Sequence, residues 1–177
     1  WHKDDRAYCR EIYSYDLFRR FGIWTAAYSS YCRLWIHVEG DKEAAYYGVY
    51  EMIEAIDDKY VKKRKSLFGD HNHNLWKCRW GATLNYNDIN HATIYYDDDS
   101  GSDYTYELKS NTDNFAAARE QLIEFSRNLT QRKGEDFHDW IASVCDVRLL
   151  LRTYAVNVAL GMWDDYWNNC NNYYIDF

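Results

Sequence analysis

Apolar side chains recur at helical spacing in three segments of the chain. The first segment follows Gly40, where Asp41 is a candidate N-cap and lysines and an arginine gather near the far end. Between them, apolar residues return at intervals of three and four, as on one face of a helix. The residues on that face are Tyr46, Val49, Ile53, Ile56 and Tyr60. This pattern predicts a helix from Asp41 to about Lys65.

Two further helices are predicted in the second half of the chain. Ser110 and Asp113 form a candidate capping box before an apolar stripe, and Gly134 stands where that helix should stop. The stripe consists of Phe115, Ala118, Leu122, Phe125 and Leu129. A longer periodic segment follows, assigned to 134–167, with apolar residues on most of its faces, which favours one buried C-terminal helix. Val156 and Val158 leave open a strand in the last half of that segment.

Between the first two helices the apolar period changes to two, which is the period of a strand with one buried face. Three alternating runs start at Cys78, Ala92 and Tyr104 and end at Tyr86, Tyr96 and Leu108. Short polar connections rich in Asn and Asp separate them, as in consecutive hairpins. The sequence therefore predicts a three-stranded antiparallel meander.

These elements together predict an α+β fold, with the meander packed against amphipathic helices. The expected organisation is a single domain over 1–177. A helical N-terminal segment over 1–40 precedes an α-β-β-β-α unit over 41–133, the C-terminal helix and an irregular tail over 168–177. Within the first segment, Tyr8 to Phe18 favours a helix. Tyr28 to Val38 fits either a helix or a strand.

Charge narrows the possible partners. The formal net charge is −7, from 28 acidic and 21 basic residues. Such a surface repels phosphate, so we expect neither nucleic-acid binding nor attachment to an anionic membrane. A protein partner with a basic surface is compatible with this negative charge. Five widely spaced cysteines without a CxxC pair favour a reducing, cytoplasmic location, and no apolar run is long enough to span a bilayer.

The absence of proline is the main compositional anomaly. At average usage of about 5%, a chain of 177 residues would hold roughly nine prolines, and this one has none. It holds 18 tyrosines and 8 tryptophans instead. The bias points either to an unusual natural sequence or to an artificial, designed one.

A loop between the first helix and the first strand offers metal ligands. Asp70, His71 and His73 place two imidazoles and a carboxylate within four positions, a donor set that suits zinc or another transition metal. Cys78, His91 or His138 would have to complete the site. The alternative is a solvated polar loop and no cofactor.

Near the end of the chain, aromatic residues alternate with carboxylates. Trp163, Tyr166 and Trp167 flank Asp164 and Asp165 and are candidates for a ligand or partner surface, or for side chains that close the core. No glycine-rich phosphate loop or nucleophile elbow is present. The first expectation is a non-catalytic acidic interaction or scaffold domain. The alternatives are a metal-binding protein or metalloenzyme centred on Asp70–His73, and a small-molecule or carbohydrate binder with an aromatic pocket.

Overall fold

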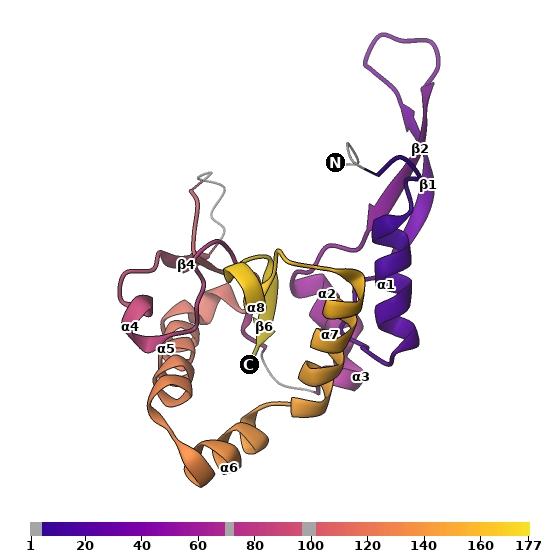
Figure 1. The fold of residues 1–177 in the computed structure, drawn as a ribbon. Coiled ribbons are helices and arrows are strands. Elements are labelled where there is room, and N and C mark those ends of the chain that lie inside the picture. The colour runs from indigo at the N-terminus through magenta and orange to yellow at the C-terminus, as the bar shows by residue number, and fades with distance from the viewer. Residues whose placement is uncertain (1–4, 70–72, 97–101) are drawn as a thin grey trace. The chain divides into compact units, whose positions relative to one another are not determined.

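The computed structural model describes residues 5–69, 73–96 and 102–177 (Figure 1). Its helices and strands together form a mixed α+β fold, which confirms the expected class. The backbone groups into two compact units, residues 1–55 and 56–177. Among the described residues, no helix has the length and apolarity needed to cross a bilayer.

The first unit combines one helix with a two-stranded hairpin. Helix α1 spans Arg10–Arg20, as the sequence predicted for this region, and Asp5 accepts backbone hydrogen bonds from Ala7, Cys9 and Arg10 at its start. Strand β1 (Ser29–Ile36) pairs antiparallel with β2 (Ala45–Ile53), which selects the strand over the helix for Tyr28 to Val38.

The helix predicted from Asp41 to Lys65 is wrong over most of its length, because β2 occupies its centre. Tyr46 and Val49, assigned to a buried stripe, are instead 50% and 60% exposed. Aromatic and β-branched residues suit a strand, and pairing with β1 satisfies the backbone that a helix would have satisfied internally. The real helix, α2 (Asp58–Lys63), begins after Asp57, whose carboxylate accepts the amides of Lys59 and Tyr60. The short helix α3 (Lys65–Phe68) follows it.

The second unit is built on a four-stranded mixed sheet, so the predicted meander is wrong. Its strands are β3 (Leu75–Cys78), β4 (Ile94–Tyr96), β5 (Tyr106–Leu108) and β6 (Tyr173–Asp176), in the order β4-β5-β3-β6. Strands β4 and β5 are parallel, and β3 pairs antiparallel with both β5 and β6. The tail expected to be irregular therefore supplies an edge strand, while the segment after Cys78 leaves the sheet and forms α4 (Tyr86–Ile89).

The two faces of this sheet differ in chemistry. Trp76 and Cys78 of β3 point to the face where helix α5 (Phe115–Gln131) buries Ala118 and Leu122, all of them fully buried. That helix confirms the second predicted stripe, although Ser110 does not cap it. The opposite face carries Leu75, which packs with Tyr60 and Val61. Successive side chains of a strand point to opposite faces, and beyond Leu75 this face carries polar side chains.

The predicted buried C-terminal helix is instead two helices with few buried residues. Helix α6 (Gly134–Val144) ends where Cys145 becomes extended, and Asp146 caps α7 (Val147–Leu160) by accepting the amide of Leu149. None of the residues of α6 is buried, and α7 buries only Val156 and Asn157. The apolar periodicity predicts helical structure here but does not show the break between the two helices, because one residue in an extended conformation is enough to end a helix.

Candidate functional site

A cluster of hydrogen-bonded polar side chains in the second unit lies between α7 and β6, over residues 162–172, which we call the Asp164 loop. Gly161, with a positive φ of 67°, ends α7, and the short helix α8 (Tyr166–Asn169) occupies the middle of the loop. Cys170 and Asn172 then adopt left-handed backbone conformations with φ of 52°. Asparagine tolerates this conformation better than most residues, which explains in part why the turn into β6 is rich in it.

Asp164 is the centre of the loop. Its Oδ1 accepts hydrogen bonds from Asn169 Nδ2 at 2.5 Å and Asn171 Nδ2 at 3.1 Å, and its Oδ2 accepts one from Asn172 Nδ2 at 2.5 Å. These bonds, above all the one from Asn169, together with the charge of Lys77, hold the pKa of Asp164 below its usual value of 3.8. The carboxylate is only half-buried. It is therefore a fixed, ionised group that still faces solvent.

Asp165, the next residue, lies in a different environment. It is 4% exposed, and its Oδ2 accepts a hydrogen bond from Asn157 Nδ2 of α7 at 2.5 Å. Its Oδ1 accepts the backbone amide of Trp167 at 3.1 Å, which caps α8. Burial raises the pKa of Asp165 above the usual value. The two neighbouring carboxyl groups thus have pKa values shifted in opposite directions by their surroundings, a feature common at functional sites.

Lys77 brings a cation to the same region from β3. It lies on the polar face of the sheet, opposite Glu107 of β5 and Tyr174 of β6 in the strand register. Its pKa is lowered, mainly by burial, and the charges of Glu107 and Asp164 act against that shift. Glu107 is itself buried at 7% exposure and contacts Lys109 Nζ at 2.8 Å and Arg79 Nε at 3.5 Å.

The aromatic residues predicted as a partner surface divide between two roles. Trp163 and Trp167 are 64% and 51% exposed, and Trp167 Nε1 donates to the carbonyl of Met162 at 3.1 Å, which fixes the ring. Tyr166 packs instead against Tyr173, with ring centroids 5.2 Å apart, at the margin of the core. The loop therefore presents two indoles to solvent on either side of Asp164 in the sequence.

Of the residues predicted to bind metal, Asp70 and His71 lie outside the described part of the chain. His73 is buried at 7% exposure, and its Nδ1 lies 2.7 Å from Asp176 Oδ2 of β6. Phe68 packs edge-on against its ring. Within residues 5–69, 73–96 and 102–177, no three His, Cys, Asp or Glu side chains converge as a metal site. The metal site remains a prediction.

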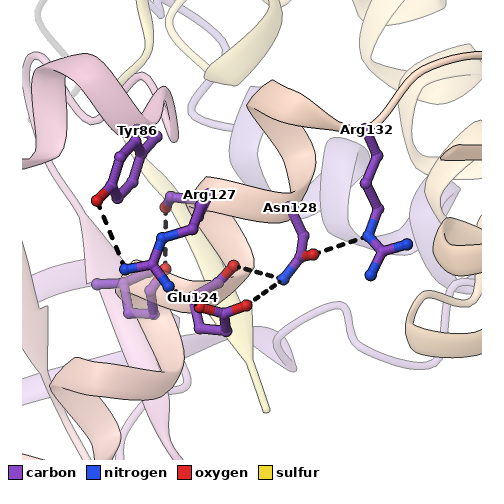
Figure 2. Close-up of polar contacts among 7 residues, drawn as sticks. Tyr86, Glu124, Arg127, Asn128 and Arg132 are labelled. Carbon is purple, nitrogen blue, oxygen red and sulfur yellow. Dashed lines mark hydrogen bonds and ion pairs between the residues drawn. The ribbon is translucent and has the colours of Figure 1, made fainter.

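A second polar network lies along α5, and Figure 2 shows its members. Arg127 contacts Glu124 and reaches the hydroxyl of Tyr86 at 3.5 Å, and Asn128 links Glu124 to Arg132 through bonds of 2.7 Å. Arg132 also bonds Asp136 at 2.6 Å. Because carboxylates already satisfy these arginines, we interpret this network as a helix-stabilising one rather than a site for an anion.

Comparison with protein-family models identifies the chain. The model described as CotH kinase protein matches residues 2–176, so the chain belongs to that family. No curated protein and no solved structure matches it. The family match gives no support to an artificial origin.

The sequence does not predict the residues that form the centre of this site. Asp164 enters the prediction only as a neighbour of the tryptophans, and Lys77, Asn157 and Asn169 do not enter it. The available signal was the recurrence of Asn and Asp after α7, at 164, 165, 168, 169, 171 and 172. Composition of this kind is also typical of ordinary turns, so only the convergence on one carboxylate distinguishes the two.

Proposed function

We propose that this chain carries the acceptor-activating side of a phosphoryl-transfer site, with Asp164 as its catalytic base. The observation that carries the proposal is the half-buried carboxylate held by three asparagine amides beside a lysine, in a chain whose family is described as a kinase. Asn169 follows Asp164 by five positions. Protein kinases place their catalytic Asp and metal-binding Asn at the same spacing.

The proposed step uses the remaining capacity of Asp164. A carboxylate offers about four lone-pair directions, and the amides take three, which leaves one for an acceptor hydroxyl. As the hydroxyl oxygen forms its bond to the γ-phosphorus of a nucleoside triphosphate, Asp164 accepts the hydroxyl proton. The bond between that phosphorus and the bridging oxygen breaks, and the nucleoside diphosphate leaves with the electron pair.

Asn169 fits the role of a magnesium ligand. Its side-chain nitrogen is engaged with Asp164, while its Oδ1 is buried and has no hydrogen-bond partner among the described residues. Amide and carboxylate oxygens are donors that magnesium accepts, usually one or two from the protein together with substrate phosphates. When bound, the ion would neutralise phosphate charge.

Lys77 supplies a fixed positive charge on the polar face of the sheet. Its partial burial lowers the number of waters that compete for the ammonium, so a phosphate oxygen would meet a less solvated donor. We propose that Lys77 binds a phosphate of the nucleotide, on the side of Asp164 opposite the acceptor.

The experiment is transfer of label from γ-³²P-ATP with magnesium to a basic acceptor, histone, and to an acidic one, casein. We expect incorporation by the parent protein and none above background by Asp164→Asn, which keeps the volume of the side chain but cannot accept the proton. Preference for histone would agree with the basic partner expected from the net charge of −7.

The matched control is Asp139→Asn, because Asp139 is an exposed carboxylate on α6 that pairs only with His138 in the contacts described. It should keep the activity of the parent. Equal activity of Asp164→Asn and the parent would refute the assignment of Asp164. No incorporation by the parent with either acceptor would refute phosphoryl transfer by this chain.

A second candidate function is the non-catalytic interaction domain expected from the sequence. The observation that favours it is the aromatic surface of the β1–β2 hairpin, where Trp35 and Tyr46 lie with ring centroids 5.0 Å apart and are 58% and 50% exposed. Exposed aromatic pairs are common in protein interfaces. Loss of partner capture by Trp35→Ser, with activity unchanged, would assign binding to the hairpin.

We also propose three features that the sequence predicts: a metal site, a carbohydrate site and a cytoplasmic location. Zinc at Asp70, His71 and His73 is tested by metal analysis of the protein and of its His71→Ala variant. A carbohydrate at Trp163 and Trp167 is tested by quenching of their fluorescence. The five cysteines are all unpaired, which supports a cytoplasmic location, and fractionation of cells tests it.

A further inference from the structure

Asp165 contacts helices α7 and α8 and the backbone of the Asp164 loop. Its backbone carbonyl accepts the amides of Asn169 at 3.2 Å and Asn171 at 3.3 Å. These are two of the three asparagines whose side chains hold Asp164. Its carboxylate caps α8 through Trp167 and reaches α7 through Asn157. One residue therefore fixes both the backbone of the loop and its attachment to a long helix.

The attachment to α7 depends on Asn157. This residue is 6% exposed, and together with Val156 it makes up the buried part of α7. A buried carboxylate without donors is costly, so Asp165 needs the amide of Asn157 as well as the backbone of α8. Helix α7 spans 14 residues, whereas α8 has only four, so the bond to Asn157 ties the short helix to a longer one.

We propose that Asp165 and Asn157 are a positioning pair that sets the direction of the Asp164 carboxylate. The inference rests on the proposed phosphoryl transfer at Asp164 and assigns to the pair no contact with substrate. Asp164 is aimed by asparagines whose backbone Asp165 holds, and the pair holds Asp165 against α7. Without the bond to Asn157, the loop keeps its sequence and its ionised Asp164 but loses its fixed orientation.

The expected consequence falls on the chemical step. Small misplacement of a reacting group costs up to about 100-fold in rate, while nucleotide binding through other groups is unaffected. Asn157→Leu, which removes the amide at similar volume, should therefore lower kcat by about 10- to 100-fold and leave KM for ATP within about twofold. The matched control is Asn87→Leu, because Asn87 is an exposed asparagine of α4, outside the Asp164 loop.

Two measurements separate positioning from loss of the fold. Hydrogen exchange should show faster exchange at the amides of Trp167, Asn169 and Asn171 in Asn157→Leu, with α5 still protected. The exchanged pair, Asn157→Asp with Asp165→Asn, restores an amide–carboxylate bond in the opposite sense and keeps the cap of α8. It should recover kcat to within about threefold of the parent, if the bond rather than the particular residue matters.

The outcomes distinguish this inference from the function on which it rests. A parent protein without transfer refutes the proposed function and the positioning pair together. Transfer by the parent, with kcat unchanged in Asn157→Leu despite faster exchange, refutes the positioning pair alone. If Asn157→Leu does not fold, the exchanged pair decides, because a loss of more than about tenfold in that folded variant overturns the inference.

Discussion

The ammonium of Lys77 lies 4.7 Å from the centre of the Tyr174 ring, across the pairing of β3 with β6. The ring holds a partly desolvated cation on the polar face of the sheet, where a phosphate would meet it. Lys77→Met should therefore weaken binding of ATP roughly tenfold or more, because a charge-assisted contact contributes about 1.5–3 kcal/mol and about 1.4 kcal/mol is tenfold. Calorimetric titration with ATP measures this.

The control for Lys77 is Lys59→Met, since Lys59 is an exposed lysine of α2. Tyr174→Phe, which keeps the aromatic ring, should retain the affinity of the parent. Unchanged affinity in Lys77→Met would exclude Lys77 from the nucleotide site.

Asp164 should contribute to stability in a pH-dependent way. Its pKa in the folded protein is below the ordinary 3.8, so its contribution is fully present above that value and is lost as pH falls through the folded pKa. Asp164→Asn places an amide among three amide donors and should lower the free energy of unfolding by about 1–2 kcal/mol at pH 7. Urea unfolding at pH 7 and pH 3 should show that cost shrinking at the lower pH. A difference between variant and parent that grows on acidification would contradict the ionised, hydrogen-bonded state.

The cysteines should differ sharply in reactivity. Burial raises the pKa of the Cys78 thiol to about 12, so at pH 8 only roughly one molecule in ten thousand carries its thiolate. Cys9 is exposed. Iodoacetamide followed by peptide mass spectrometry should label Cys9 in the native protein and Cys78 only in urea. Similar native rates at both thiols would mean that the core around Cys78 opens readily.

The core between α5 and the sheet should dominate the stability of the second unit. Leu122 is fully buried there, and Leu122→Ala should lower the free energy of unfolding by about 2–5 kcal/mol through lost contacts and the cavity left behind. Leu151 of α7 is 63% exposed, so Leu151→Ala should change the free energy of unfolding by less than about 0.5 kcal/mol. Urea titration followed by tryptophan fluorescence compares them. Equal losses would show that α7 is covered in solution.

The apolar spacing predicts a helix correctly where one helix covers the whole stripe. The stripe from Phe115 to Leu129 is regular over four turns, and α5 forms over that range with Ala118 and Leu122 buried. The helix predicted from Tyr46 and Val49 is wrong, because spacings of three and four also occur by chance in a strand rich in aromatic residues. Ser110 shows a related limit: its hydroxyl bonds the carbonyl of His73 and the amide of Leu75, 37 and 35 positions away, rather than a helix start.

By itself, the sequence determined the α+β class, α1, α5 and the presence of strands around Ile94 and Tyr106, since hydrophobic period and helix-end residues are local properties. Tertiary structure decided which strands pair, because alternation selects the buried face but not the partner. It also decided the candidate site. Lys77 is far from Asp164 along the chain, and Asp164 itself stands in a turn-like composition. Only the fold brings an ionised carboxylate, its amide donors and a cation together.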